Sequence, residues 1–240
     1  MPASCCGKSA IYNLKSEICL TPIMHDSAVD AIITALTATP APPDAVNMYA
    51  PTAAPGNTLR SANLALALRL ALARGPDLLL VGEAPGYNGA RRTGVPFTSE
   101  RLLLAGLPEL GQFGTSQGFA LATTDGRLAG EPTATIVYRE LRALGLFAVG
   151  WNAYPLHPHR PGNTQSNRPP RAAELALGRP FLARVLALFP GVPVVAMGKV
   201  AAAALTHLGV AHVPLRHPAQ GGAQRFAEGL RAFANGRGNG

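Results

Sequence analysis

Three polar segments of the sequence carry side chains that could do chemistry, and each of them follows a short apolar run. GEAPGYNG begins at Gly82 and places the carboxylate Glu83 directly after its run. WNAYPLHPH carries the amide Asn152, and RHPAQGG carries the imidazole His217 between an arginine and a proline. By residue type alone, the first segment has three interpretations: a phosphate-binding loop, a hydrolytic site or a structural turn.

The elements that must position these segments are visible as an alternation. Apolar runs at residues 77–82, 146–152 and 192–198, with a shorter one at 211–215, are separated by stretches with helical spacing. Short apolar runs between helices are typical of parallel strands buried on both faces. We therefore predict a three-layer α/β/α sandwich around a mostly parallel four-stranded sheet. Ligands bind beyond the carboxyl ends of such strands, so the polar segments should meet at one edge.

The predicted helices connect and flank these strands. They cover residues 25–37, 58–74, 132–144, 170–189, 199–208 and 223–234. Asn57 or Thr58 is the expected cap of the second helix. Residues 1–23 hold all three cysteines and two of the three lysines, and we predict a disordered or non-native extension there, followed by a single domain over residues 24–240.

The charge balance favours an anionic partner. The 240 residues include 21 Lys and Arg against 13 Asp and Glu, a formal net charge of +8, and such an excess speeds encounter with nucleic acid. The apolar runs near residues 32–37 and 63–73 are too short or too interrupted for membrane spans, and no cleavable signal pattern is evident. We therefore expect a cytoplasmic protein with no membrane partner.

Several other sites can be weighed from their motifs. His157 and His159 lack an accompanying carboxylate or thiolate, so no metal site is predicted. GEAPGYNG lacks the dinucleotide spacing G-x-G-x-x-G, and the segment at Lys199 lacks the other residues of a phosphate loop, so Lys199 is expected to begin a surface helix. GTSQG around Ser116 matches G-x-S-x-G without a buried strand before it, so a variable loop is expected there and an esterase remains an alternative.

Taken in order, the polar segments resemble a known family. GEAPG at residues 82–86, an Asn after the second run, and HPA followed by a glycine-rich turn resemble the uracil-DNA glycosylase superfamily. TGVPFTSE at residues 93–100 extends the first match, and NRPP at residues 167–170 is similar to a connector in some branches. The resemblance spans roughly residues 57–234 and is to a bacterial branch with GEAPG and HPA motifs and no iron–sulfur cysteines.

This resemblance implies a monofunctional DNA glycosylase that hydrolyses the N-glycosidic bond of uracil or a related deaminated base after the nucleotide is flipped out. It implies that Glu83 orients the attacking water. It further implies that Asn152 pairs with the base edge and that His217 donates to the developing oxygen anion. Phe97 matches the aromatic that stacks on the base.

Other site residues follow from the same resemblance. The implied base pocket comprises Gly82, Ala84, Pro85, Gly86, Phe97 and Asn152. The implied DNA-binding residues are Arg91, Arg92, Arg216, Pro218 and Gln220. Glu100 is a reserve candidate for the carboxylate, although it could equally cap a helix.

Departures from the family pattern leave the activity and substrate open. Ala84 stands where an aspartate is usual, Gly86 where a tyrosine excludes thymine, and Ala219 where a serine is usual. Tyr87 could restore part of the barrier to thymine. These departures motivate an alternative, a non-catalytic DNA-binding or damage-sensing protein. In either case we expect a monomer with no cofactor, since the iron–sulfur cysteines are missing.

Overall fold

The computed structural model describes residues 17–237, and the predicted extension falls mainly on residues 1–16, outside this range. The strands are β1 (Ala45–Val46), β2 (Leu78–Gly82), β3 (Ala148–Asn152), β4 (His157–Pro158), β5 (Val194–Met197) and β6 (Val213–Leu215). The helices are α1 (Glu17–Ala38), α2 (Asn57–Arg74), α3 (Ala90–Thr93), α4 (Glu100–Ala105), α5 (Pro132–Ala143), α6 (Ala172–Leu188), α7 (Lys199–His207) and α8 (Ala223–Arg237), with short 3-10 turns η1 (Pro108–Leu110) and η2 (Thr115–Gln117).

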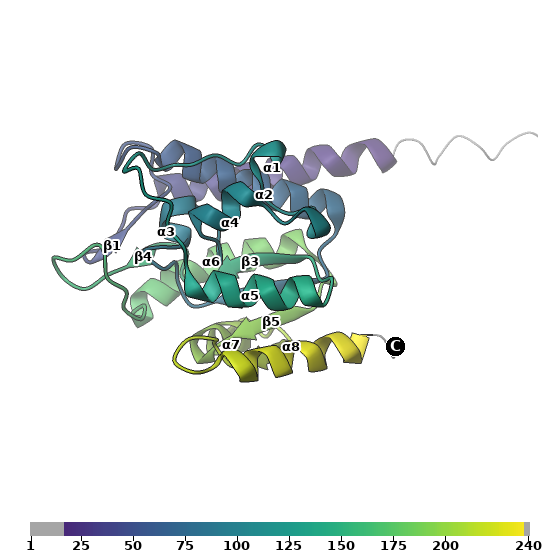
Figure 1. The fold of residues 1–240 in the computed structure, drawn as a ribbon. Helices are drawn as coiled ribbons and strands as arrows, with labels where there is room; N and C mark the ends of the chain where they lie inside the picture. Colours follow the sequence, from purple (N-terminus) through teal and green to yellow (C-terminus); the bar gives the residue numbers. More distant parts are fainter. Residues whose placement is uncertain (1–16, 238–240) are drawn as a thin grey trace, which may run out of the picture.

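The central sheet has the order β3-β2-β5-β6, and all of its pairs are parallel. The fold class predicted from the sequence is therefore confirmed. The register places Gly82 opposite Asn152, so the segments that follow β2 and β3 leave the sheet at the same level. A separate antiparallel pair joins β1 to β4, and Figure 1 shows both strands beside α3 at one end of the molecule.

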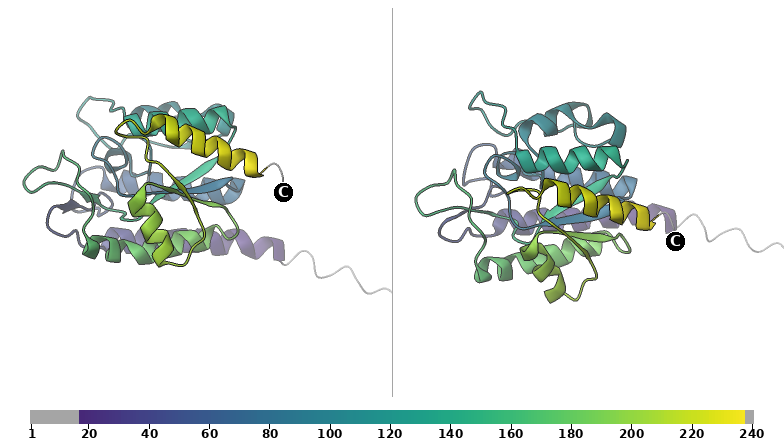
Figure 2. Two further views of the ribbon diagram at one scale, coloured as in Figure 1. Left: turned by 90° about the horizontal axis from the view of Figure 1, so that it is seen from below. Right: turned by 60° about the horizontal axis from the view of Figure 1, so that its bottom comes forward.

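Alternation along each strand divides the core between two faces of the sheet. Leu79 and Val81 belong to a buried cluster that includes side chains of α1, α6 and α7. Leu78 and Leu80 belong to a second cluster that includes side chains of α5 and α8. In the left panel of Figure 2, α5 and α8 lie on one side of the sheet and α1 and α6 on the other. Burial on both faces is why the inner strands β2 and β5 carry no polar side chain.

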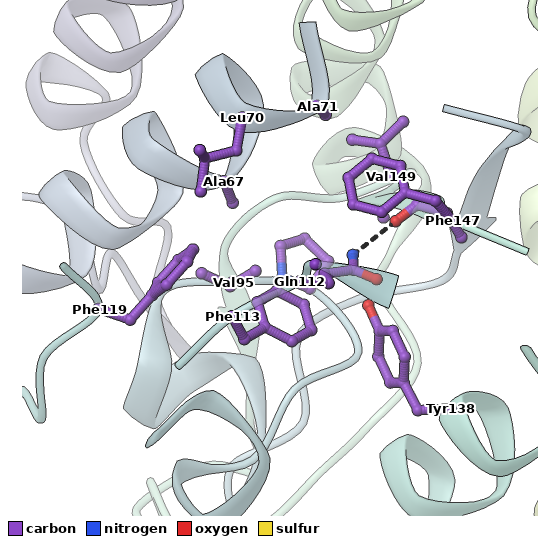
Figure 3. A pocket seen from close by; sticks show the side chains of 14 residues that line it. Ala67, Leu70, Ala71, Val95, Gln112, Phe113, Phe119, Tyr138, Phe147 and Val149 are labelled. Carbon is purple, nitrogen blue, oxygen red and sulfur yellow. Dashed lines mark hydrogen bonds between the residues drawn. The ribbon is translucent and has the colours of Figure 1, made fainter. Parts of the chain in front are cut away.

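The outer edge of β3 is covered. Helix α2 contacts β3 and contributes side chains to both core clusters. The Gln112 side-chain amide donates to the carbonyl oxygen of Ala148 on β3 at 2.8 Å (Figure 3). The void beside Gln112 measures about 20 Å³, and a single water needs roughly 10–15 Å³. This region closes an edge of the sheet and has no room for a nucleobase.

The start of α2 differs from the prediction. Neither Asn57 nor Thr58 caps the helix. The N-cap is Gly56, at a φ of 80°, and it makes no side-chain cap. The Asn57 side chain is buried and donates to the carbonyl oxygen of Ala50 at 2.7 Å. Because the Asn57 side chain binds the preceding loop, it does not accept from the free backbone N–H groups of the first helical turn.

The first and last helices are longer than predicted. The helix expected from residue 25 begins at Glu17, and the last helix continues to Arg237. Within residues 17–237, none of the helices combines the length and apolar character that a bilayer crossing requires.

Candidate active site

A cavity of about 690 Å³ opens at the carboxyl ends of the central strands. Glu83 after β2, Asn152 at the end of β3, and His217 after β6 all line it, together with Phe97. Residues separated by more than a hundred positions in the chain therefore share one cavity. The prediction that the polar segments meet at one edge is confirmed.

Hydrogen bonds fix the backbone at Glu83, whereas its carboxylate has no hydrogen-bond partner among the described residues. The carbonyl oxygens of Gly82 and Glu83 accept from the backbone of Ala153 at 2.8 Å and Tyr154 at 3.0 Å. Within residues 17–237, no hydrogen bond or ion pair engages the Glu83 carboxylate. Burial raises the pKa of this carboxyl above its ordinary value. A half-buried carboxylate without a protein partner can accept a proton from water or stabilise a cation.

Asn152 presents a second unpartnered group. Its side chain is only 4% exposed, and no hydrogen bond engages its amide within the described part of the chain. A buried amide without a partner costs free energy unless a ligand or water completes its hydrogen bonds. Asn152 can therefore offer one acceptor and two donor hydrogens to a ligand in the cavity.

Phe97 packs over two glycines, Gly82 at the end of β2 and Gly150 in the middle of β3. A Cβ atom built on Gly82 would lie 2.6 Å from the Phe97 ring and 2.9 Å from Asn152 Oδ1, and one on Gly150 would lie 2.7 Å from the ring. Neither contact is sterically possible, so both positions require glycine for the ring to lie here. Phe97 itself has a φ of 57°, a left-handed conformation that is costly for an aromatic residue. Such strain is typical of positions held for function.

The surroundings of Phe97 also explain the role of Gly82. Gly82 does not line the cavity but supports the residues that do. Ala84, Pro85 and Gly86 line the cavity as predicted. A Cβ atom at Gly86 would meet nothing within 4 Å, and Tyr87 is not part of the cavity wall. The structure therefore leaves the space beside Gly86 open.

The His217 ring has a defined tautomer when neutral. The backbone N–H of Ala219 donates to Nδ1 at 3.1 Å, so Nδ1 is the acceptor and Nε2 carries the hydrogen. Burial and the charge of Arg216 lower the pKa of His217, against the opposing effect of Glu131. The loop closes tightly, because a Cβ atom on Gly222 would lie 2.0 Å from the His217 carbonyl oxygen. His217 can thus act as a neutral hydrogen-bond donor through Nε2.

The predicted DNA-binding residues divide into separate groups. Arg216 and Gln220 line the cavity, whereas Pro218 is buried and does not. Arg91 and Arg92 lie on α3 and line a different groove. Of the α3 residues, Ala90 lines the cavity, whereas Arg91 and Arg92 line the second groove.

Glu100 is placed away from the cavity. The residue is 0% exposed, and Oε2 lies 2.8 Å from Nε of Arg92 and 2.9 Å from the backbone N of Ala129. Thr123 donates to the other oxygen. The cap of α4 is Ser99, whose hydroxyl accepts from the backbone of Leu102. Ser99 and not Glu100 is therefore the cap of α4, and the Glu100 oxygens hold neighbouring segments together outside the cavity.

Sequence reasoning missed other cavity residues. Glu131 lines the cavity and caps α5, accepting from the backbone of Thr133 at 3.1 Å and Ala134 at 2.5 Å. The sequence feature that indicates the Glu131 cap is a carboxylate directly before a proline at the start of a helix. Lys199 begins α7, as expected, but also lines the cavity. Asn167 lines it too, and its Oδ1 accepts from the backbone of Tyr87 at 3.0 Å.

The remaining motifs lie outside this cavity. Ser116 is exposed on η2, with no strand before it, so the loop predicted there is confirmed. His157 and His159 have ring centroids 6.1 Å apart and hydrogen-bond to backbone carbonyls of Pro85 and Arg160. Among the described residues, no cluster of His, Cys, Asp and Glu could hold a metal ion.

Comparisons with known proteins agree with this fold. No curated protein matches the chain. Among solved structures, the crystal structure of wild-type SMUG2 from Pedobacter heparinus is similar with a TM-score of 0.59 and 16% identity, over 89% of this chain and 99% of that one. This likeness concerns the fold. The sequence profile of the uracil DNA glycosylase superfamily matches residues 71–235, a segment that runs from the end of α2 into α8 and contains the whole central sheet. The chain therefore belongs to the uracil-DNA glycosylase superfamily.

Proposed function

We propose that the protein is a monofunctional DNA glycosylase that hydrolyses the N-glycosidic bond of uracil or a related deaminated base. One observation carries the proposal. The Glu83 carboxylate, the Asn152 amide and the Nε2–H of His217 are three groups without protein partners in one cavity. Unpartnered buried polar groups are costly in a protein that has no ligand for them, and family membership makes a flipped nucleotide the ligand of choice.

The carboxylate acts on the sugar side of the bond. Departure of the base leaves a cation-like sugar, and a carboxylate beside it both stabilises the positive charge and orients water for attack. The raised pKa of Glu83 makes its carboxylate a stronger base than an exposed glutamate. The ionised form of Glu83 is the active form.

The amide, the ring and the imidazole act on the base. Stacking on Phe97 contributes about 1–3 kcal/mol. Asn152 offers a donor and an acceptor in one plane, which matches the N–H and carbonyl of a uracil edge. His217 donates through Nε2–H to the oxygen that becomes negative as the base leaves. Because the lowered pKa keeps His217 neutral, this contact stabilises an anion without transferring a proton.

The rim of the cavity fits a DNA strand. Arg216 and Gln220 stand on the exposed loop around His217, where they meet the phosphates and the space left by the flipped nucleotide. Pro218 is buried and has a structural role in this loop. The open space beside Gly86 admits a base with a substituent that a larger side chain would exclude.

A base-release assay tests the proposal. Labelled oligonucleotides containing uracil, hypoxanthine or xanthine, single or double stranded, are incubated with the protein and then with alkali, which cleaves at abasic sites. We expect strand breaks with at least one base. The Ser116→Ala variant serves as the control and should match the native protein. No break with any base would sink the enzymatic proposal.

The same assay separates the alternative function. Ala84, Gly86 and Ala219 depart from the family pattern, which favours a DNA-binding or damage-sensing protein without base release. Salt-sensitive DNA binding with no strand break would support that alternative. Hydrolysis of a chromogenic ester that is lost in Ser116→Ala would instead support an esterase.

A further inference from the structure

A second groove lies on the other side of α3. It has a volume of about 500 Å³, and Arg60, Arg91 and Arg92 are among the residues that line it. Ala90, the first residue of α3, lines the candidate active site, while Arg91 lines this groove. The two hollows are thus separated by a helix of 4 residues.

The three guanidinium groups are satisfied to different degrees. Arg92 donates to both carboxylate oxygens of Asp125 at 2.8 Å and lies against Glu100. Arg60 donates to backbone and amide oxygens, including Asn57 Oδ1 at 2.5 Å. Within residues 17–237, no hydrogen bond or ion pair engages the guanidinium of Arg91. Arg91 therefore has all its donors available for a ligand.

The groove carries a positive charge without a counterion. Three guanidinium groups face two carboxylates, Glu100 and Asp125, and both carboxylates are paired with Arg92. Partial burial and the charge of Arg92 lower the pKa of Arg91. An anion bound at Arg91 would offset both the desolvation and the repulsion. A half-buried guanidinium is weakly hydrated and can bind a phosphate through two parallel hydrogen bonds.

The rest of the lining adds an apolar surface. Leu59 is 43% exposed and lines the groove together with Val46 and Pro55. Exposed leucine beside unpaired arginine fits a ligand with an anionic group and a flat apolar face. A nucleotide has both.

We propose that this groove binds a flanking nucleotide of the DNA strand whose neighbouring nucleotide occupies the candidate active site, with a phosphate at Arg91 and the sugar or base against Leu59. The choice of DNA as ligand rests on the proposed function. Ala90 lines one hollow and Arg91 the other, so neighbouring nucleotides of one strand that crosses α3 can reach both. Arg91 and Leu59 thereby bind the strand outside the reacting nucleotide.

Anisotropy of a labelled single-stranded oligonucleotide with one central uracil tests the subsite. Arg91→Ala should weaken binding about tenfold, the effect of one charge-assisted hydrogen bond. The slope of log K against log salt should fall by about 0.7, the value for one phosphate on a single strand. The matched control is Arg184→Ala, which removes an exposed arginine of α6 outside both hollows and should change neither quantity. Arg91→Lys should keep most of the salt slope.

Truncated oligonucleotides locate the contact. Shortening the strand on one side of the uracil should weaken binding to the native protein, and this loss should disappear in Arg91→Ala. Equal affinities and slopes for Arg91→Ala and Arg184→Ala, or no DNA binding by the native protein, would overturn the subsite. Thermal unfolding of each variant identifies any loss of DNA affinity that is caused by misfolding. If Arg91→Ala does not fold, the affinity and salt slope of Arg91→Lys test the subsite in its place.

Base release is measured separately with the same oligonucleotide. If binding depends on Arg91 but no base is released, the subsite stands and the glycosylase proposal fails. If base is released but Arg91→Ala binds like Arg184→Ala, the glycosylase proposal stands and the subsite fails.

Discussion

Glu83 and Glu100 stand at the two ends of residues 83–100, but the surroundings of their carboxylates differ. Glu83 is half-buried, faces the cavity and has no protein partner within the described residues. Glu100 is fully buried, forms an ion pair with Arg92, and accepts hydrogen bonds from Thr123 and the backbone of Ala129. The more deeply buried carboxylate is thus the better satisfied one. The difference indicates that Glu100 contributes to folding, while Glu83 retains lone pairs for a ligand.

The largest expected effect is on base release by Glu83→Gln. Glutamine preserves the size of the side chain but cannot carry the negative charge that stabilises the sugar cation. We expect the single-turnover rate to fall about 10²–10⁴-fold, as is usual for loss of a positioned acid or base. In the native protein the rate should rise with pH through the raised pKa of Glu83. A near-normal rate in Glu83→Gln would contradict the catalytic role that distinguishes Glu83 from Glu100.

Glu100→Gln should act on stability instead. Removing one partner of a buried ion pair costs about 3–5 kcal/mol, which for a chain of 240 residues lowers Tm by roughly 10 °C. Thermal unfolding followed by circular dichroism measures this loss. Base release per folded molecule should remain in the native range. A variant that is stable but inactive would return Glu100 to the list of catalytic candidates.

The smallest expected effect is on the stability of Glu83→Gln. The folded protein holds a proton on Glu83 more tightly than the unfolded chain does, because burial raises the pKa. Ionisation therefore costs stability as pH rises from the unfolded value of about 4.3 through the raised folded value. Glutamine avoids this cost, so the variant should have a slightly higher Tm than the native protein at pH 8. Below pH 4 the two should converge; a lower Tm at pH 8 would indicate that Glu83 holds the loop.

Much of the fold could be predicted because it depends on local pattern. Apolar runs buried on both faces, alternating with helices, indicate a parallel sheet, and strand ends then indicate where Glu83, Asn152 and His217 meet. The helix caps expected at Asn57 and Glu100 were wrong for one shared reason. Each side chain forms hydrogen bonds outside its own helix, and residue type cannot indicate which of several partners is near.

By itself, the sequence determined the α/β alternation, the order of the three polar segments and the glycines that follow β2. These properties are local, since they depend on periodicity and on the conformations that each residue allows. Only the tertiary structure decided which carboxylate is free, which tautomer of His217 is held, and on which side of α3 the arginines lie. Those outcomes depend on distances between segments, and distances arise only when the chain has packed.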